Sequence, residues 1–313
     1  MPVTQRDVRN RIDAVKNIQK ITRAMEMVAA ARLRRAEQRI EALRPYASAI
    51  RRMTRQAAEA AGNVPNLPIL AERENVSSVG LLLIAGDRGL AGAFNSNIVR
   101  RGVAAGREHD SQGRKPVYFA SGRRPASSLT FRGLQPADSF TGFTDRPAYA
   151  DARRIAERLI AAYVDEEVDR VELIYNRFVS PLTQYVWRQT LLPLQQAEVV
   201  GEGAEEEEEA SVEEEQSGST DSGVDQSRSE WFFEPDAEEL LGRLIPEYVT
   251  ISVYRALLES AASELGARMT AMRNAAENAE KINEKLTLEM NRARQAEITQ
   301  EILEVVAGAE ALS

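Results

Sequence analysis

The sequence contains no cysteine among its 313 residues and only one histidine, His109. Without cysteine there can be no disulfide, thiolate metal site or cysteine nucleophile. A single histidine cannot share a metal ion with a second one, which excludes most histidine-based chemistry. No apolar run approaches the ~20 residues that cross a bilayer, and the start, MPVTQRDVRNRID, lacks the apolar stretch of a secretory signal. This composition is typical of a soluble, intracellular protein.

Negative charge is concentrated in one segment, although the whole chain has a net charge of −8. Residues 198–230 contain thirteen acidic residues and one arginine, a net charge of −12, whereas residues 1–60 have a net charge of +8. The basic segment includes ARLRRAEQR, which has four arginines but no interleaved aromatic residue and no known DNA-binding motif. A basic collar on a helix suits an acidic protein partner, and we favour that interpretation over nucleic-acid binding.

Proline and glycine are scarce at both ends of the chain. Neither occurs between Pro2 and Pro45, and after Pro246 only Gly266 and Gly308 interrupt the sequence. Apolar residues recur there every three or four positions, which predicts two helices of roughly 65 Å and up to about 100 Å. Each helix has only a narrow apolar stripe, so each needs a partner in water. An antiparallel coiled coil of the two is the simplest arrangement. Two separate helical-bundle segments within a globule remain open at this point.

Strands and helices alternate in the middle of the chain. The run VGLLLIAG predicts a buried strand, KPVYFAS a second one, and RVELIYNRFV with QYVWRQTLLPL a closing hairpin. FNSNIVRRGVAAGREH predicts a helix capped by Asn95 or Ser96, and ADARRIAERLIAAYVDEE a helix that starts near Tyr149. This order predicts a small α/β domain with a partly parallel sheet. The acidic, Ser- and Gly-rich residues 198–229 carry too little apolar surface to fold, so we expect disorder there.

The stretch GDRGLAGAFNSN follows the first predicted strand and raises the question of a phosphate-binding turn. Its glycines Gly86, Gly89 and Gly92 are spaced G-x-x-G-x-x-G, whereas dinucleotide sites use G-x-G-x-x-G and P-loops need a lysine. Asp87 would also repel a pyrophosphate at close range. We therefore favour a tight strand-to-helix turn over a nucleotide site. No other motif nominates an active site: His109 lies in the polar stretch GREHDSQGRK, where a solvated histidine is expected.

Three blocks of the sequence together resemble one protein family. VKNIQKITRAMEMVAAARLRRAE (15–37), GDRGLAGAFNSN (86–97) and ITQEILEVVAGAEAL (298–312) are similar to the gamma subunit of the F-type ATP synthase. The likeness covers the chain apart from residues 198–229. It implies a mixed α+β and α/β fold, with a long antiparallel coiled coil and a central Rossmann-like domain. The implied segments are a helix in 1–62, the α/β domain in 75–196, a disordered acidic insertion in 198–229 and a helix in 230–313.

The resemblance also implies a function and partners. Gamma subunits form a central rotor shaft that carries torque between a proton-driven c ring and catalytic beta subunits. The chain is therefore expected to have no reaction, cofactor or metal of its own, and to bind neither nucleic acid nor a small-molecule substrate. The implied partners are three alpha and three beta subunits, the epsilon subunit and the c ring. One copy per complex is expected, peripheral to the membrane at the cytoplasmic face of the bacterial inner membrane.

Matching the family's motifs assigns contact residues on both terminal helices. Those expected to meet the beta subunits are Arg23, Met25, Glu26, Arg32, Arg34, Arg35, Arg268, Arg294, Gln295, Thr299 and Glu301. Those expected to meet the c ring lie in WFFEPD and are Trp231, Phe233, Glu234 and Asp236.

Two further interpretations stay open from the sequence. The chain could instead be a free-standing coiled-coil scaffold with an α/β head, which would form a homodimer by itself. The acidic insertion could regulate rotation or assembly electrostatically, but we favour a neutral surface addition. Because the chain lacks cysteine, the insertion cannot carry the thiol switch that chloroplast members of the family have at this place.

Overall fold

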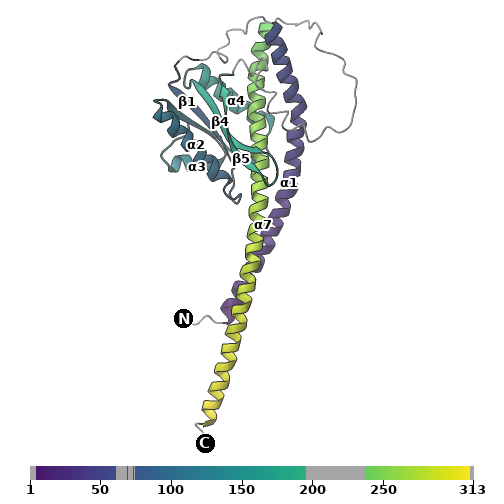
Figure 1. The fold of residues 1–313 in the computed structure, drawn as a ribbon, viewed down its shortest axis with the longest axis vertical. Coiled ribbons are helices and arrows are strands. Elements are labelled where there is room, and N and C mark those ends of the chain that lie inside the picture. Colours follow the sequence, from purple (N-terminus) through teal and green to yellow (C-terminus); the bar gives the residue numbers. More distant parts are fainter. Residues whose placement is uncertain (1–4, 61–68, 70–72, 74, 195–236, 311–313) are drawn as a thin grey trace, which may run out of the picture. The chain divides into compact units, whose positions relative to one another are not determined.

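A computed structural model of the chain describes residues 5–60, 69, 73, 75–194 and 237–310 (Figure 1). The chain divides into two compact units. Unit 1 consists of Met1–Arg34, Leu90–Gly92 and Leu265–Ser313, and unit 2 of Arg35–Gly89 and Ala93–Glu264. Two long helices, α1 (Gln5–Ala60) and α7 (Ala237–Glu310), contribute residues to both units.

Unit 2 is built on a five-stranded sheet with the strand order β3-β2-β1-β4-β5. The strands are β1 (Ser78–Ile84), β2 (Lys115–Ser121), β3 (Asp138–Phe140), β4 (Arg170–Phe178) and β5 (Gln184–Leu192). The first four strands are parallel and β5 pairs antiparallel with β4. The shorter helices are α2 (Phe94–Ser111), α3 (Arg123–Phe131) and α4 (Tyr149–Val164). This strand order is that of a Rossmann-like sheet.

Strand β1 is continuously apolar because it lies between two parallel neighbours and is covered on both faces. Its residues Val79 to Ile84 are all buried. Helix α2 covers one face and approaches closely at Gly102, where a Cβ would lie 2.5 Å from Cδ2 of Leu83. Glycine is therefore required there to let the helix reach the sheet.

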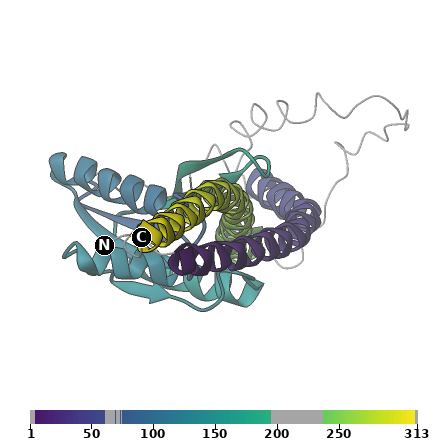
Figure 2. The ribbon, with the colours of Figure 1, turned by 90° about the horizontal axis from the view of Figure 1, so that it is seen from below.

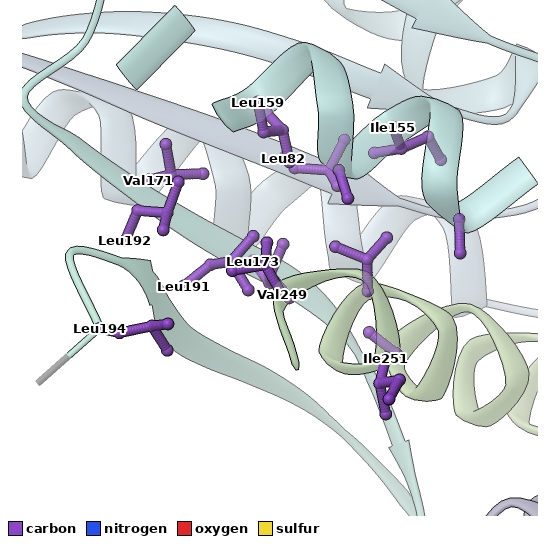
Figure 3. Close-up of a cluster of buried hydrophobic side chains, with 14 of the residues drawn as sticks. Leu82, Ile155, Leu159, Val171, Leu173, Leu191, Leu192, Leu194, Val249 and Ile251 are labelled. Atoms are coloured by element: carbon purple, nitrogen blue, oxygen red, sulfur yellow. The ribbon is translucent and has the colours of Figure 1, made fainter. Parts of the chain in front are cut away.

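The main apolar core of unit 2 lies on the other face of the sheet. Leu82 and Leu173 from the central strands pack with Ile155 of α4 and Val249 of α7, and Ile50 of α1 belongs to the same cluster (Figure 3). The segments of α1 and α7 in unit 2 are thus part of the core of the α/β unit. Burial of this apolar surface holds them to the sheet.

In unit 1, the first part of α1 lies beside the middle part of α7, and the end of α7 extends past the start of α1 (Figures 1 and 2). The predicted mixed fold, with paired terminal helices and a central α/β region, is confirmed. The predicted helix start at Tyr149 and the closing hairpin of β4 and β5 are also confirmed. The segment boundaries 1–62, 75–196, 198–229 and 230–313 stay predictions. Residues 198–229 and the c-ring contacts Trp231, Phe233, Glu234 and Asp236 lie outside the described residues.

Two details of the α/β region were predicted wrongly. Helix α3 and strand β3 were not expected, because both are short and α3 buries only Pro125 and Leu129. Helix α2 begins at Phe94, so neither Asn95 nor Ser96 is its cap. The Oδ1 of Asn95 instead accepts from the Gly86 N–H at 2.8 Å and its Nδ2 donates to the Arg88 carbonyl at 3.0 Å.

The prediction of a solvated loop histidine was also wrong. His109 lies in the last turn of α2 and is 2% exposed. Its Nε2 accepts from Arg188 at 2.8 Å and lies 3.3 Å from the carboxylate of Glu172. Arg188 also donates to Glu172 at 2.7 Å and to Glu108 at 2.8 Å. The single histidine is therefore part of a polar cluster that joins α2 to β4 and β5.

Replacing Glu172 by glutamine should lower the free energy of unfolding by about 1–2 kcal/mol, because the half-buried Arg188 loses a charge-assisted partner. Burial raises the pKa of Glu172, but the hydrogen bond and the charge of Arg188 lower it more, so the net shift is downward. The stabilisation is thus present above the ordinary pKa of a glutamate and is lost as pH falls through the lowered one. Denaturant unfolding should show this, with Glu108→Gln, whose side chain is 51% exposed, changing little. Equal losses in both variants would contradict the assignment.

Candidate functional site

The paired helices of unit 1 share a heptad stripe. Met25 and Ala30 of α1, and residues 266–268, 270, 271 and 275 of α7, are buried or half-buried beside it, whereas the stripe itself consists of residues spaced alternately by four and three positions. In α1 these residues are Val8, Ile12, Val15, Gln19, Thr22, Glu26, Ala29 and Leu33. In α7 they are Leu265, Met269, Met272, Ala276, Ala279, Asn283, Leu286, Met290 and Ala293. A seven-residue repeat on both helices is typical of a left-handed coiled coil.

Two interhelical ion pairs show the direction and register of this coiled coil. Arg23 lies 3.6 Å from Glu280, and Arg273 lies 2.9 Å from Glu26. The earlier residue of α1 pairs with the later residue of α7, so the two helices are antiparallel. Surface ion pairs contribute little stability, so the seam itself must hold the helices together.

Small and polar residues make up much of the seam. Ala29, Ala276 and Ala279 are at most 5% exposed and allow the helices to approach closely. Gln19 and Asn283 are polar members, and the register places them across from each other. The Oδ1 of Asn283 is buried without a hydrogen-bond partner. Polar seam residues of this kind specify register at a cost in stability.

The residues predicted to contact the beta subunits are almost all in unit 1, with Arg35 as the first residue of unit 2. Met25, Glu26 and Arg268 are half-buried. The exposed ones are Arg23, Arg32, Arg34, Arg35, Arg294, Gln295, Thr299 and Glu301. Glu26 is a seam residue held by Arg273. The register separates the set into two groups, one around Arg268 and one from Arg294 onward, about 40 Å apart along α7.

The seam does not continue to the end of α7. Beyond Ala293 the side chains are exposed, including the apolar residues Ile298, Ile302, Leu303, Val305 and Val306. Nothing in the described part of the chain covers them. An exposed apolar face of this size on a helix indicates a surface for a partner.

The glycine-rich turn after β1 is held together by Asp87. Its Oδ1 accepts from the Arg123 N–H at 2.9 Å, at the start of α3. Its Oδ2 accepts from the Gly142 N–H at 2.9 Å and from the Thr144 hydroxyl at 3.0 Å. The start of a helix is where a bound anion would be stabilised, and this side chain occupies that place. The turn therefore serves to join three loops.

Helix α7 covers the carboxyl ends of the central strands, where Rossmann-like sheets bind their ligands. The Ser260 hydroxyl donates to the Ile84 carbonyl at 3.1 Å, at the end of β1. The Ser263 hydroxyl donates to the Asn176 carbonyl at 3.2 Å, near the end of β4. Glu264 is 2% exposed, and a Cβ on Gly86 would lie 2.7 Å from its carboxylate. Side chains of α7 thus occupy the space at this switch point.

Sequence reasoning missed these α7 residues. The available signal was the polar set in LLESAASELG, inside a stretch whose apolar residues are buried. Buried polar side chains in a helix need partners, but the partners of Ser260 and Ser263 are 176 and 87 residues away in the chain. Helical periodicity alone could not identify them.

A second polar contact of α7 lies about 20 Å before Ser260 along the helix. Glu247 accepts from the Tyr149 hydroxyl of α4 at 2.5 Å and from the Tyr46 hydroxyl of α1 at 3.1 Å. Burial, together with the hydrogen bond and charge of Glu247, raises the pKa of Tyr149. This carboxylate therefore joins three helices of unit 2.

Gly86→Ala should lower the free energy of unfolding by about 1–3 kcal/mol, since the added methyl group overpacks against the buried Glu264 carboxylate. Denaturant unfolding of the full chain measures this. Gly242→Ala in α7 is the matched control, because nothing lies within 4 Å of the Cβ it would add. It should raise stability by about 0.5–1 kcal/mol. A Gly86→Ala variant as stable as the parent would show that the turn is not closely packed.

The described residues contain no group of three or more histidine, aspartate or glutamate side chains that could hold a metal ion. Of the helices in the described ranges, none is both long and apolar enough to cross a membrane.

Comparison with known proteins identifies the class of protein. A family model described as ATP synthase matches residues 4–312. ATP synthase gamma chains of Rubrobacter xylanophilus and Nostoc punctiforme are 44% and 43% identical over 308 and 320 residues, which is 98% of this chain and of each relative. In a solved structure of the central stalk and c-ring of Tetrahymena thermophila mitochondrial ATP synthase, one chain is 26% identical. It has a TM-score of 0.56, and the match covers 82% of this chain and 99% of that one.

These matches define a subunit of ATP synthase. The chain belongs to the ATP synthase gamma chain family. Its function is accordingly that of a central-stalk rotor subunit in ATP synthesis.

Proposed function

We propose that this chain turns as a shaft inside a ring of three alpha and three beta subunits. It transmits torque between the beta subunits, where catalysis takes place, and a proton-driven c ring, and it has no reaction of its own. The observation that carries the proposal is the heptad seam on both helices of unit 1. Two helices packed along a continuous seam resist bending and unwinding better than one.

Exposed charged residues that could contact a partner lie at two places along unit 1. Arg32 and Arg34 are exposed on α1, close to Arg35 in the sequence, and a basic cluster favours an acidic protein partner. The second place is near Arg294 and Glu301 on α7. The exposed apolar face beyond Ala293 would be covered by the surrounding ring.

The remaining partners are proposed from the family. The c ring would be contacted through Trp231, Phe233, Glu234 and Asp236, and the epsilon subunit would lie beside unit 2. One copy of the chain would be present per complex. It would be held at the cytoplasmic face of the bacterial inner membrane through its partners.

Purification of the chain under gentle detergent tests this proposal. Recovery of the alpha, beta, epsilon and c subunits, with one copy of this chain for three of beta, is the expected result. A free-standing scaffold would instead be recovered as a homodimer without these subunits. That outcome would overturn the proposed function.

Addition of ATP or NAD to the isolated chain tests the alternative of a nucleotide-binding α/β enzyme. We expect no change in melting temperature, because Asp87 and α7 side chains occupy the places where the phosphates would lie. A nucleotide-dependent rise in melting temperature would contradict the proposal.

A further inference from the structure

Helix α7 is joined to the sheet of unit 2 by directional contacts as well as by apolar packing. Ser260 and Ser263 are 4% and 0% exposed, and each donates to a main-chain carbonyl of a different central strand. Strands β1 and β4 are neighbours in the sheet, so the two hydroxyls hold adjacent strands. With a separation of three residues, both lie on the same face of the helix.

These contacts differ in kind from the apolar core around them. Apolar contact is non-directional, so it opposes separation of a helix from a sheet but resists sliding or rolling weakly. A hydrogen bond depends on distance and angle, and it is stronger in a buried, low-dielectric place. Two such bonds to different strands fix both the rotation of α7 about its axis and its position along that axis.

Glu247 supplies a second fixed point on the same helix. It accepts from Tyr149 of α4 and Tyr46 of α1, all within unit 2. Polar contacts thus hold α7 at two places about 20 Å apart. The helix continues past Glu264 as one helix to Glu310, and its part from Leu265 onward belongs to unit 1.

We propose that Ser260 and Ser263 are positioning residues for torque transfer, which lock α7 against twisting and sliding on the sheet. This inference rests on the proposed rotor function and specifies where force passes from the α/β unit to the shaft. The two hydroxyls contact no substrate and act through the orientation of α7. Loss of the two hydroxyls should lower the torsional stiffness of the joint between α7 and the sheet. The chemistry at the beta subunits should not change.

The test uses the assembled complex, with the beta subunits fixed to a surface and a bead on unit 2. The angular spread of the bead in a stalled rotor measures torsional stiffness. For the Ser260→Ala/Ser263→Ala variant we expect the angular variance to rise by roughly twofold, since two directional bonds are removed. The rate of ATP hydrolysis without load should remain that of the parent.

Ser252→Ala is the matched control, because its hydroxyl donates to the Tyr248 carbonyl within the same helix and not to the sheet. It should leave the variance unchanged. If the double variant does not assemble, the single variants Ser260→Ala and Ser263→Ala each remove one of the two bonds, and a smaller increase in the variance is expected. Unchanged variance in the serine variants, or an equal rise in the control, would overturn the inference. Absence of rotation in the parent complex would instead overturn the proposed function.

Discussion

Asp169→Asn is expected to lower the free energy of unfolding of the chain by about 3 kcal/mol at pH 7. The carboxylate of Asp169 accepts hydrogen bonds from three residues of the described part of unit 2. Its Oδ1 accepts a hydrogen bond from Nη1 of Arg73 at 2.8 Å. Its Oδ2 accepts from the main-chain N–H groups of Ser77 and Ser78 at 2.9 and 2.8 Å. The hydroxyls of both serines donate to it as well. An amide cannot accept all these bonds, and the arginine would lose its counter-charge.

The same substitution should remove a defined part of the pH dependence. Burial by itself raises the pKa of Asp169. The hydrogen bonds from Ser77, Ser78 and Arg73 lower it by more, so the net pKa is about 2. A lowered pKa means that the stabilisation is fully present above about pH 4 and is lost as pH falls through about 2. The shift corresponds to about 2 kcal/mol.

Denaturant unfolding of the full chain between pH 7 and pH 2 measures this effect. The difference between parent and Asp169→Asn should be constant down to about pH 4 and then shrink. Asp165→Asn, four residues earlier on the exposed end of α4, is the control and should change stability by less than about 0.5 kcal/mol. A difference that stays constant down to pH 2 would show that the carboxylate charge is not what stabilises this site.

Ala29→Asp should uncouple rotation from catalysis. Ala29 is 1% exposed in the seam of the coiled coil, near Met272 in the register set by the ion pairs. A carboxylate there would be buried without a partner, at a cost of at least about 3 kcal/mol, which the narrow seam cannot offset. We expect ATP-driven proton pumping by the assembled complex to be largely lost, while ATP hydrolysis persists.

Ala31→Asp introduces the same charge two residues further, on the exposed side of α1. It should retain both pumping and hydrolysis. Circular dichroism of the isolated chains should show a loss of helix in the Ala29 variant alone. Equal pumping in the two variants would mean that the seam of unit 1 is not required for coupling.

The paired helices could be predicted from the sequence because their signal is local. The apolar residues of a heptad repeat are three or four positions apart, as are Ala29 and Leu33 or Met272 and Ala276, so the pattern lies within neighbouring turns of one helix. Strand β1 was equally accessible, since burial on both faces leaves an unbroken apolar run.

Features that depend on distant partners could not be predicted in the same way. His109 looked solvated because its flanks are polar, yet its partners Glu172 and Arg188 are 63 and 79 residues away. The role of Asp87 was partly accessible: its charge argued against a phosphate site, whereas its bonds to Arg123 and Thr144 appear only in the folded chain.

The predicted contact residues came from family resemblance, which assigns a role to each position but says nothing of its surroundings. The structure adds that Glu26 is held in the seam by Arg273. It also separates Arg268 from Arg294 and Glu301 along α7. The beta-subunit contacts themselves stay predictions.

Direct observation of rotation tests the central claim most directly. The complex is fixed through its beta subunits, a bead is attached to unit 2 of this chain, and ATP is added. If the chain is the shaft, the bead will turn in one direction and pause at three angles in each turn, one for each beta subunit. ATP hydrolysis with a bead that stays still would contradict the account.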